Sequence, residues 1–192
     1  MAHLSTDQID EGIAALAPAP INNGQVVSLL IRPETDQREV VSQVHVIPGE
    51  GIVGDNYLAR GSKRTPDGKA HPEAQVAMMN ANVLNVLAGG QEGLWPLAGD
   101  QLLVDFDLST DNVPAGTRFS IGSATFEVAN KPHNGCAKFA ERFGVDAARF
   151  SNSDKIQRYR GINLMVVVEG DVTIGDTITK IEASGTGSFP PA

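Results

Sequence analysis

The sequence is short of several features, and each shortage argues against a class of protein. Only one cysteine occurs in 192 residues, so the chain forms no internal disulfide. No apolar run is long enough to cross a bilayer and no charged-then-apolar leader opens the chain, so we expect a reducing, cytoplasmic location. The formal net charge is −8, which argues against general affinity for nucleic acid or an anionic membrane surface.

Motifs that bind nucleotides are missing as well. Residues 48–56 form a glycine-containing connection, but they lack the glycine spacing and the Lys-Ser/Thr ending of a Walker motif. No dinucleotide fingerprint follows a predicted strand, and no fixed-period repeat indicates a solenoid or propeller. The length and the 41% hydrophobic content suit one domain. We expect an extension with a short helix over residues 1–23, the domain over 24–182, and a flexible tail over 183–192.

Short β-branched runs separated by Gly, Asp and Pro turns make up most of the chain. A doubly wound α/β sheet would need longer crossover helices than these patterns supply. We therefore predict a mainly β protein, a closed and mostly antiparallel β-barrel with a few short helices, because closure removes exposed strand edges. The predicted strands are residues 26–31, 39–47 interrupted at Ser42, 75–79, 102–106, 117–128 in two pieces, 162–168 and a last pair around 174–178, with helices over 5–16, 81–88 and 136–143.

The single cysteine, Cys136, stands where a chain leaving Lys131 is predicted to enter a short helix. Asn134 is a plausible N-cap, which would place Cys136 in the first helical turn. Unpaired backbone N–H groups and the helix dipole favour an anion there and would lower the pKa of the thiol. The thiolate attacks electrophilic sulfur or carbonyl groups and binds soft metals, so Cys136 is a candidate reactive sulfur. The alternative is a buried cysteine that only fills the core.

The segment around this cysteine is basic although the chain is acidic. Residues 131–160 contain seven Lys or Arg residues against three Asp or Glu residues, a net charge of +4. Arg and Lys give charge-assisted hydrogen bonds to phosphate oxygens, so the segment suits a small anionic ligand such as a phosphate-bearing cofactor. The alternative is a helix face that is simply solvated.

The order of several short motifs resembles the MOSC domain, named for the C-terminal part of molybdenum-cofactor sulfurases. The motifs are Gly51-x-x-Gly54-Asp55, Gly99-Asp100-Gln101-Leu102, the stretch 114–128, a cysteine that opens a helix, Arg160-Gly161-Ile162 and Val172-x-x-Gly175-Asp176-x-Ile178. Three positions depart from the usual family pattern: Asp100-Gln101 within Gly-x-Asn-Leu, Gly135 in place of proline, and Asn56-Tyr57 after the first Gly-Asp turn. The resemblance covers about residues 24–182 and implies a barrel that binds the molybdenum cofactor or carries sulfur as a cysteine persulfide.

The resemblance also implies roles for individual residues. Cys136 would carry the transferred sulfur or ligate molybdenum, since a soft thiolate suits both tasks. Lys131, His133 and Lys138 would hold that thiolate ionised, although His133 has the alternative of a simple hydrogen bond to a carbonyl group.

Four further residues complete the expected site. Arg158 and Arg160 would grip the phosphate of the cofactor, the alternative being that both side chains extend from a strand edge into solvent. Asp55 and Asp100 lie on turns, where each would orient an amine of the ligand or cap its own backbone.

The resemblance implies partners too, namely a cysteine desulfurase or a molybdoenzyme. The chain is too short to contain the pyridoxal-phosphate module of the fused sulfurases, so that cofactor would act only through a partner. Two other functions stay open: a stand-alone molybdenum-dependent reductase of N-hydroxylated compounds, and a module that binds cofactor without turnover. A zinc site built from Cys136, His133 and His71 is a poor match to tetrahedral ligand spacing.

Overall fold

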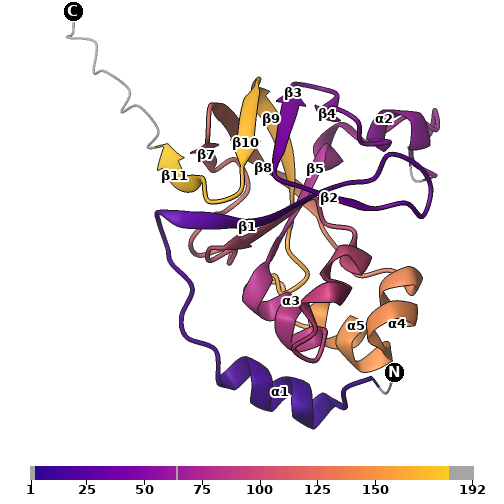
Figure 1. Ribbon diagram of the computed structural model, residues 1–192, viewed down its shortest axis with the longest axis vertical. Helices are drawn as coiled ribbons and strands as arrows, with labels where there is room; N and C mark the ends of the chain where they lie inside the picture. Colours follow the sequence, from indigo (N-terminus) through magenta and orange to yellow (C-terminus); the bar gives the residue numbers. More distant parts are fainter. Residues whose placement is uncertain (1–2, 64, 182–192) are drawn as a thin grey trace, which may run out of the picture.

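Seven strands close a barrel in the computed structural model, which describes residues 3–63 and 65–181 (Figure 1). Their order around the barrel is β11-β7-β8-β9-β5-β6-β1, and β1 pairs back with β11 through Gly24 opposite Ile178. The predicted closed barrel is therefore confirmed, whereas the expected tail lies outside the described residues. The strands are β1 (Gly24–Ile31), β5 (Val76–Asn80), β6 (Leu102–Asp105), β7 (Arg118–Ile121), β8 (Ala124–Pro132), β9 (Ile162–Val168) and β11 (Thr177–Ile181).

One pair of barrel strands is parallel and the other described pairs are antiparallel. In the parallel pair, Met78 of β5 lies opposite Leu102 of β6. Parallel neighbours need a crossover connection, and helix α3 (Ala81–Leu87) followed by the 3₁₀ helix η2 (Glu92–Ala98) provides it. This crossover returns the chain to the rim of the barrel immediately before Asp100.

A smaller sheet lies beside the barrel and explains the predicted interruption at Ser42. Strand β2 (Glu39–Val41) pairs with β1, whereas β3 (Gln43–Ile47) pairs with β10 (Gly170–Thr173) and β4 (Gly51–Ile52). The carbonyl of Ser42 accepts a hydrogen bond from Ile174 N–H at 3.0 Å, so the chain leaves one sheet and enters the other at this residue.

The barrel interior is filled with side chains. The rings of Phe106, Phe119 and Phe126 lie at its centre, with centroids 6.3 and 6.2 Å apart, and all three are fully buried. Barrels of this size have room for side chains and little else. A ligand must therefore bind at the rim.

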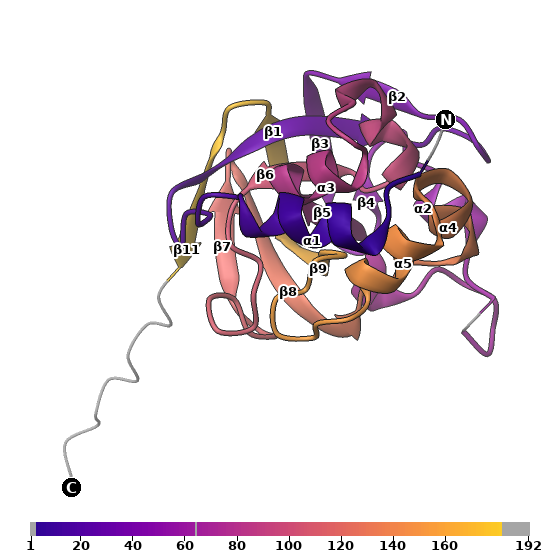
Figure 2. The same ribbon diagram turned by 90° about the horizontal axis from the view of Figure 1, so that it is seen from below.

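Most of the helices gather at one end of the barrel, as Figures 1 and 2 show. Helix α1 (Thr6–Ala14) begins with the predicted capping box of Ser5 and Gln8, and its Ile9 is fully buried in a second apolar cluster. The expected extension is thus part of the packed structure. The remaining helices are α2 (Tyr57–Arg60), the 3₁₀ helix η1 (Pro72–Ala74), α4 (Ala137–Phe143) and α5 (Val145–Ser151). None of the helices in the described part of the chain is long and apolar enough to span a bilayer.

Candidate functional site

A cavity of about 320 Å³ opens at the rim of the barrel beside Cys136. Its walls come from the chain after β1, the end of α2, the turn after η2, the end of β8 and helix α4. Two acidic residues, Glu34 and Asp36, lie among its lining residues. Seven cationic residues outnumber them: Arg32, Arg38, Arg60, Lys131, Lys138, Arg142 and Arg160. We call this space the cationic cavity, and its excess positive charge favours an anionic ligand.

Cys136 is exposed on the wall of the cationic cavity. The predicted N-cap at Asn134 is wrong, because α4 begins at Ala137 and Cys136 itself is the N-cap residue, without a side-chain capping bond. The physical reason lies in the loop: Gly135 N–H donates instead to Asn152 Oδ1 at 2.8 Å, which keeps the chain extended up to Cys136. The cysteine therefore stands just before the first helical turn, among cationic side chains.

Asp100, His133 and Arg160 form one cluster, in which His133 and Arg160 line the cationic cavity and Asp100 is buried behind them. Arg160 Nη1 donates to the two carboxylate oxygens of Asp100 at 2.7 and 2.8 Å, and His133 Nε2 lies 2.7 Å from Asp100 Oδ1. The side chain of Asp100 is fully buried and that of Arg160 is 7% exposed. Arg160 also lies over the ring of Phe139, with its guanidinium carbon 4.7 Å from the ring centroid. Asp100 thus binds two protein side chains and leaves Arg160 Nη1 unavailable for a phosphate.

Charge within this cluster sets its protonation. Burial is the largest single effect and favours the neutral acid of Asp100, but the charge of Arg160 and the contact with His133 together outweigh it and hold the pKa of that carboxyl below its usual value. Burial lowers the pKa of His133, and the charge of Arg160 lowers it further, while Asp100 acts in the opposite direction. At neutral pH we therefore expect an ionised Asp100 and a neutral His133.

Asp55 forms a second carboxylate centre on the same side of the barrel. Its fully buried side chain accepts hydrogen bonds from Arg32 Nε at 2.9 Å and Arg32 Nη2 at 3.0 Å. It also accepts the backbone N–H of Arg32 at 2.9 Å and that of Tyr57 at 3.0 Å. Because the carboxylate is saturated by protein donors, Asp55 positions Arg32 at the cavity wall and does not reach a ligand.

Buried polar atoms without partners gather around the cationic cavity. Six buried side-chain nitrogen or oxygen atoms in the described residues have no hydrogen-bond partner, and four belong to residues that line this cavity. An unpaired buried polar group costs about 1–3 kcal/mol, so a ligand with matching groups gains from pairing them. The four atoms are Arg38 Nε, Asn56 Oδ1, Gln101 Nε2 and Arg160 Nε.

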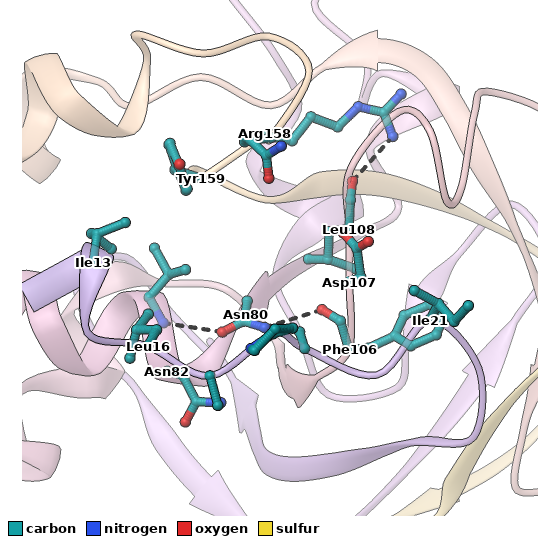
Figure 3. Close-up of a pocket in the computed structure, with 15 residues that line it drawn as sticks. Ile13, Leu16, Ile21, Asn80, Asn82, Phe106, Asp107, Leu108, Arg158 and Tyr159 are labelled. Atoms are coloured by element: carbon teal, nitrogen blue, oxygen red, sulfur yellow. Dashed lines mark hydrogen bonds between the residues drawn. The ribbon is translucent and has the colours of Figure 1, made fainter.

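Arg158 lies away from the cationic cavity. Its Nη1 donates to the carbonyl of Val113 at 2.9 Å, and Figure 3 shows its side chain beside the carbonyl of Leu108 in a different pocket, which Ile13 and Ile21 also line. His71 is also outside the cationic cavity, where its Nδ1 accepts from the backbone N–H of Glu73. Among residues 3–63 and 65–181, no group of three or more His, Cys, Asp or Glu side chains is able to hold a metal ion.

Five of the predicted site residues line the cationic cavity: Lys131, His133, Cys136, Lys138 and Arg160. Sequence reasoning gave no site role to four arginines of the same wall, although one of them, Arg142, belongs to the basic segment 131–160. They are Arg32, Arg38, Arg60 and Arg142.

Comparison with known proteins assigns this barrel to a domain family. The sequence profile of the MOSC domain matches residues 69–179, more than half of the chain. The chain belongs to the MOSC domain family. MOSC domains are associated with the molybdenum cofactor, so this barrel is a molybdenum-cofactor-related domain.

Solved structures show the same MOSC fold. The YuaD protein from Bacillus subtilis matches with a TM-score of 0.58 and 17% identity over 81% of this chain and 94% of its own. YiiM from Escherichia coli gives a TM-score of 0.55 and 18% identity over 83% and 70% of the two chains. YiiM from Geobacillus stearothermophilus gives 0.53 and 16% over 83% and 75%. At these identities the similarity shows the fold alone. A comparison with curated proteins found no match.

Proposed function

We propose that the cationic cavity binds the phosphate-bearing pterin of the molybdenum cofactor, and that Cys136 ligates the metal or carries sulfur for it as a persulfide. The observation that supports this most directly is the exposed thiol of Cys136 on the wall of a cavity lined by seven cationic side chains. A soft sulfur donor suits molybdenum, and guanidinium and ammonium groups suit phosphate.

The residues present fit such a cofactor. The unpartnered polar atoms of Arg38, Asn56 and Gln101 offer one guanidinium donor, one acceptor and one amide donor, which match the amide-like edge of a pterin and its phosphate. The molybdenum would supply a redox-active centre that also accepts sulfur ligands. Cavity and thiol together thus provide an anion site and a metal or sulfur site.

In this proposal the phosphate of the cofactor is bound by residues other than the predicted Arg158 and Arg160. Arg158 lies outside the cavity, and Arg160 Nη1 is held by Asp100. Arg60 is exposed and makes no hydrogen bond or salt bridge within the described part of the chain, so its guanidinium is free for a ligand. Lys138 is exposed too, and the carboxylate that it contacts, Asp36 at 2.7 Å, is 59% exposed and easily displaced.

Metal and pterin analysis of protein purified from cells that make the cofactor tests the binding part. Wild-type protein should retain molybdenum and a pterin in comparable amounts, and Arg60→Ala should lower both. Arg149→Ala is the matched control, because Arg149 is an exposed arginine on α5 outside the cavity. Equal loss from both variants, or no molybdenum in the wild type, would remove the cofactor from the proposal.

Intact mass after incubation with a cysteine desulfurase tests the sulfur part. Wild-type protein should gain one sulfur atom that a reductant removes, and Cys136→Ser should gain none. If Cys136→Ser loses molybdenum while the wild type never gains sulfur, the thiol is a metal ligand. Turnover of an N-hydroxylated compound with an artificial electron donor would then favour the reductase over a carrier or a non-catalytic module.

A further inference from the structure

The loop that leads into Cys136 is held by a residue of a different helix. Gly135 N–H donates to Asn152 Oδ1 at 2.8 Å, and Asn152 Nδ2 donates a longer bond of 3.4 Å to the carbonyl of Gly135. One side chain thus pairs with both polar groups of a single backbone residue, which fixes the orientation of its amide. These are the only hydrogen bonds that Asn134 or Gly135 makes within the described part of the chain.

Asn152 belongs to a well-anchored part of the fold. It is the C-cap residue of α5, and its backbone N–H donates to the carbonyl of Arg149 at 3.2 Å. Ser151, the residue before it, is 2% exposed. The ring of Phe150 stacks on that of Tyr159, with centroids 4.7 Å apart. The side chain of Asn152 therefore holds the loop from a fixed support.

The loop and the end of α5 also approach each other closely. A Cβ added to Gly135 would lie 3.2 Å from Ser151 Oγ and 3.2 Å from Asn152 Nδ2. The φ of Gly135 lies outside the left-handed region, so its backbone conformation does not require glycine. The close contact with α5 is what leaves little room for a side chain at this position.

The backbone of Cys136 is held on both sides. After it, the carbonyl of Cys136 accepts hydrogen bonds from the N–H groups of Phe139 and Ala140 at 2.9 and 3.1 Å, which begin α4. Before it, Asn152 holds Gly135. Cys136 itself is extended, with φ −115° and ψ 177°. Because the allowed rotamers of a side chain depend on its backbone angles, these two supports set where the thiol lies.

A buried amide supports the view that the cationic cavity takes a ligand. Gln101 lines this cavity and is 1% exposed, and its Nε2 has no hydrogen-bond partner in the described residues. Its Oε1 accepts the N–H of Ala77 at 2.8 Å, so the amide orientation is fixed. A ligand that accepts from Nε2 would remove the cost of a buried donor without a partner. The position of the thiol on the wall of this cavity therefore bears on what the protein binds.

We propose that Asn152 is a positioning residue, which holds the thiol of Cys136 against the cationic cavity so that anionic partners reach it there. This inference rests on the proposed role of Cys136 as sulfur carrier or metal ligand. Without the amide of Asn152, the loop loses its support before Cys136 and keeps only α4 after it. The thiol then moves relative to the cationic side chains, and their attraction for an anionic partner weakens with distance.

Two thiol reagents of opposite charge character measure this position. 5,5′-Dithiobis(2-nitrobenzoate) is an anionic aromatic disulfide, and 4,4′-dithiodipyridine is a neutral one of similar size. In each case the thiolate of Cys136, the single cysteine, attacks one sulfur of the reagent. A mixed disulfide forms, the S–S bond of the reagent breaks, and the other half leaves as a coloured thiol product. Both reactions use the same thiolate, so the ratio of their rates does not depend on the ionised fraction.

Wild-type protein should favour the anionic reagent at about 0.01 M salt, and the preference should shrink at about 1 M, where the screening length falls from about 30 to about 3 Å. Asn152→Ala should lower the low-salt ratio by about threefold or more. Gly135→Val pushes the loop away from α5 while Asn152 stays in place, and should lower the ratio as well. Asn130→Ala is the matched control and should keep the wild-type ratio, because Asn130 is an exposed asparagine outside the cationic cavity.

Hydrogen exchange of the Gly135 amide, followed by NMR, gives a readout that needs no reagent. This amide should be protected in wild-type protein and should exchange at least about tenfold faster in Asn152→Ala. An unchanged reagent ratio in folded Asn152→Ala, or a Gly135 amide that stays protected there, would overturn the inference and leave the proposed function standing. A wild-type ratio that salt does not change would mean that the cations do not act on the thiol, and would remove the inference together with the main support of the proposed function.

Discussion

Replacing Asp100 with alanine tests how the protein holds a cation in its interior. The Asp100 side chain is fully buried and its partner Arg160 is 7% exposed. Without the carboxylate, the guanidinium of Arg160 keeps only the carbonyl of Ala98 at 3.3 Å, the sulfur of Met79 and the ring of Phe139. Breaking one partner out of a buried ion pair costs about 3–5 kcal/mol, because the remaining charge is uncompensated.

That loss is large against the whole stability of the protein. A natural domain has about 5–15 kcal/mol in total, and each kcal/mol shifts the midpoint of thermal unfolding by about 2–4 °C at this size. Asp100→Ala should therefore lower the unfolding midpoint by about 6–20 °C at pH 7 in a calorimetric scan. Asp36→Ala is the control and should leave the midpoint near wild type, because the Asp36 carboxylate is 59% exposed.

The dependence on pH follows from the lowered pKa of Asp100. A carboxyl whose pKa is lower in the folded state stabilises the fold above its unfolded pKa of about 3.9, and that contribution disappears as the pH falls through the folded value. The gap between wild type and Asp100→Ala should thus be constant near neutrality and shrink in acid. A double variant, Asp100→Leu with Arg160→Met, should recover much of the loss. A drop of less than about 1 kcal/mol in Asp100→Ala would refute the reasoning.

Two further predictions concern other parts of the fold. Hydrogen bonds to Asp171 and Glu169 raise the pKa of His45, so its contribution should be complete below about pH 6.5 and fade as the pH rises through the folded value; His45→Gln should abolish this fall in denaturant titrations from pH 5.5 to 8.5. Gly161 and Gly175 both have positive φ, but a Cβ on Gly161 meets the backbone of β5, whereas one on Gly175 meets nothing. Gly161→Ala should lose about 1–3 kcal/mol more stability than Gly175→Ala, and equal losses would contradict this.

The sequence contained enough to predict the barrel. Strands β5, β6 and β9 lie within one or two residues of the predicted ranges, because β-branched runs between turn residues are a local signal. Several short helices carried no such signal. Helix α5, with seven residues, and helix α2, with four, are too short to show an apolar period.

The sequence did not reveal which side chains from distant parts of the chain bind each other. Asp100 and Arg160 were each predicted to hold a ligand, and the structure shows that they bind each other. Asp55 likewise holds Arg32, a residue that no local motif singled out. The N-cap prediction at Asn134 failed for a related reason, because Asn152, distant in sequence, takes the neighbouring backbone N–H. Local patterns state which residues turn or alternate, but not which side chains meet.

The seam between β1 and β11 has a consequence for synthesis. Gly24 and Gln25 of β1 pair with Ile178 and Thr177 of β11. The backbone at the start of β1 is therefore covered only after β11 has been synthesised and has paired with it. A nascent chain still on the ribosome therefore exposes unpaired backbone at the start of β1 until β11 has emerged, and such edges invite pairing with other chains. Deleting β11 should open the barrel and leave the edges of β1 and β7 that it covers prone to aggregation.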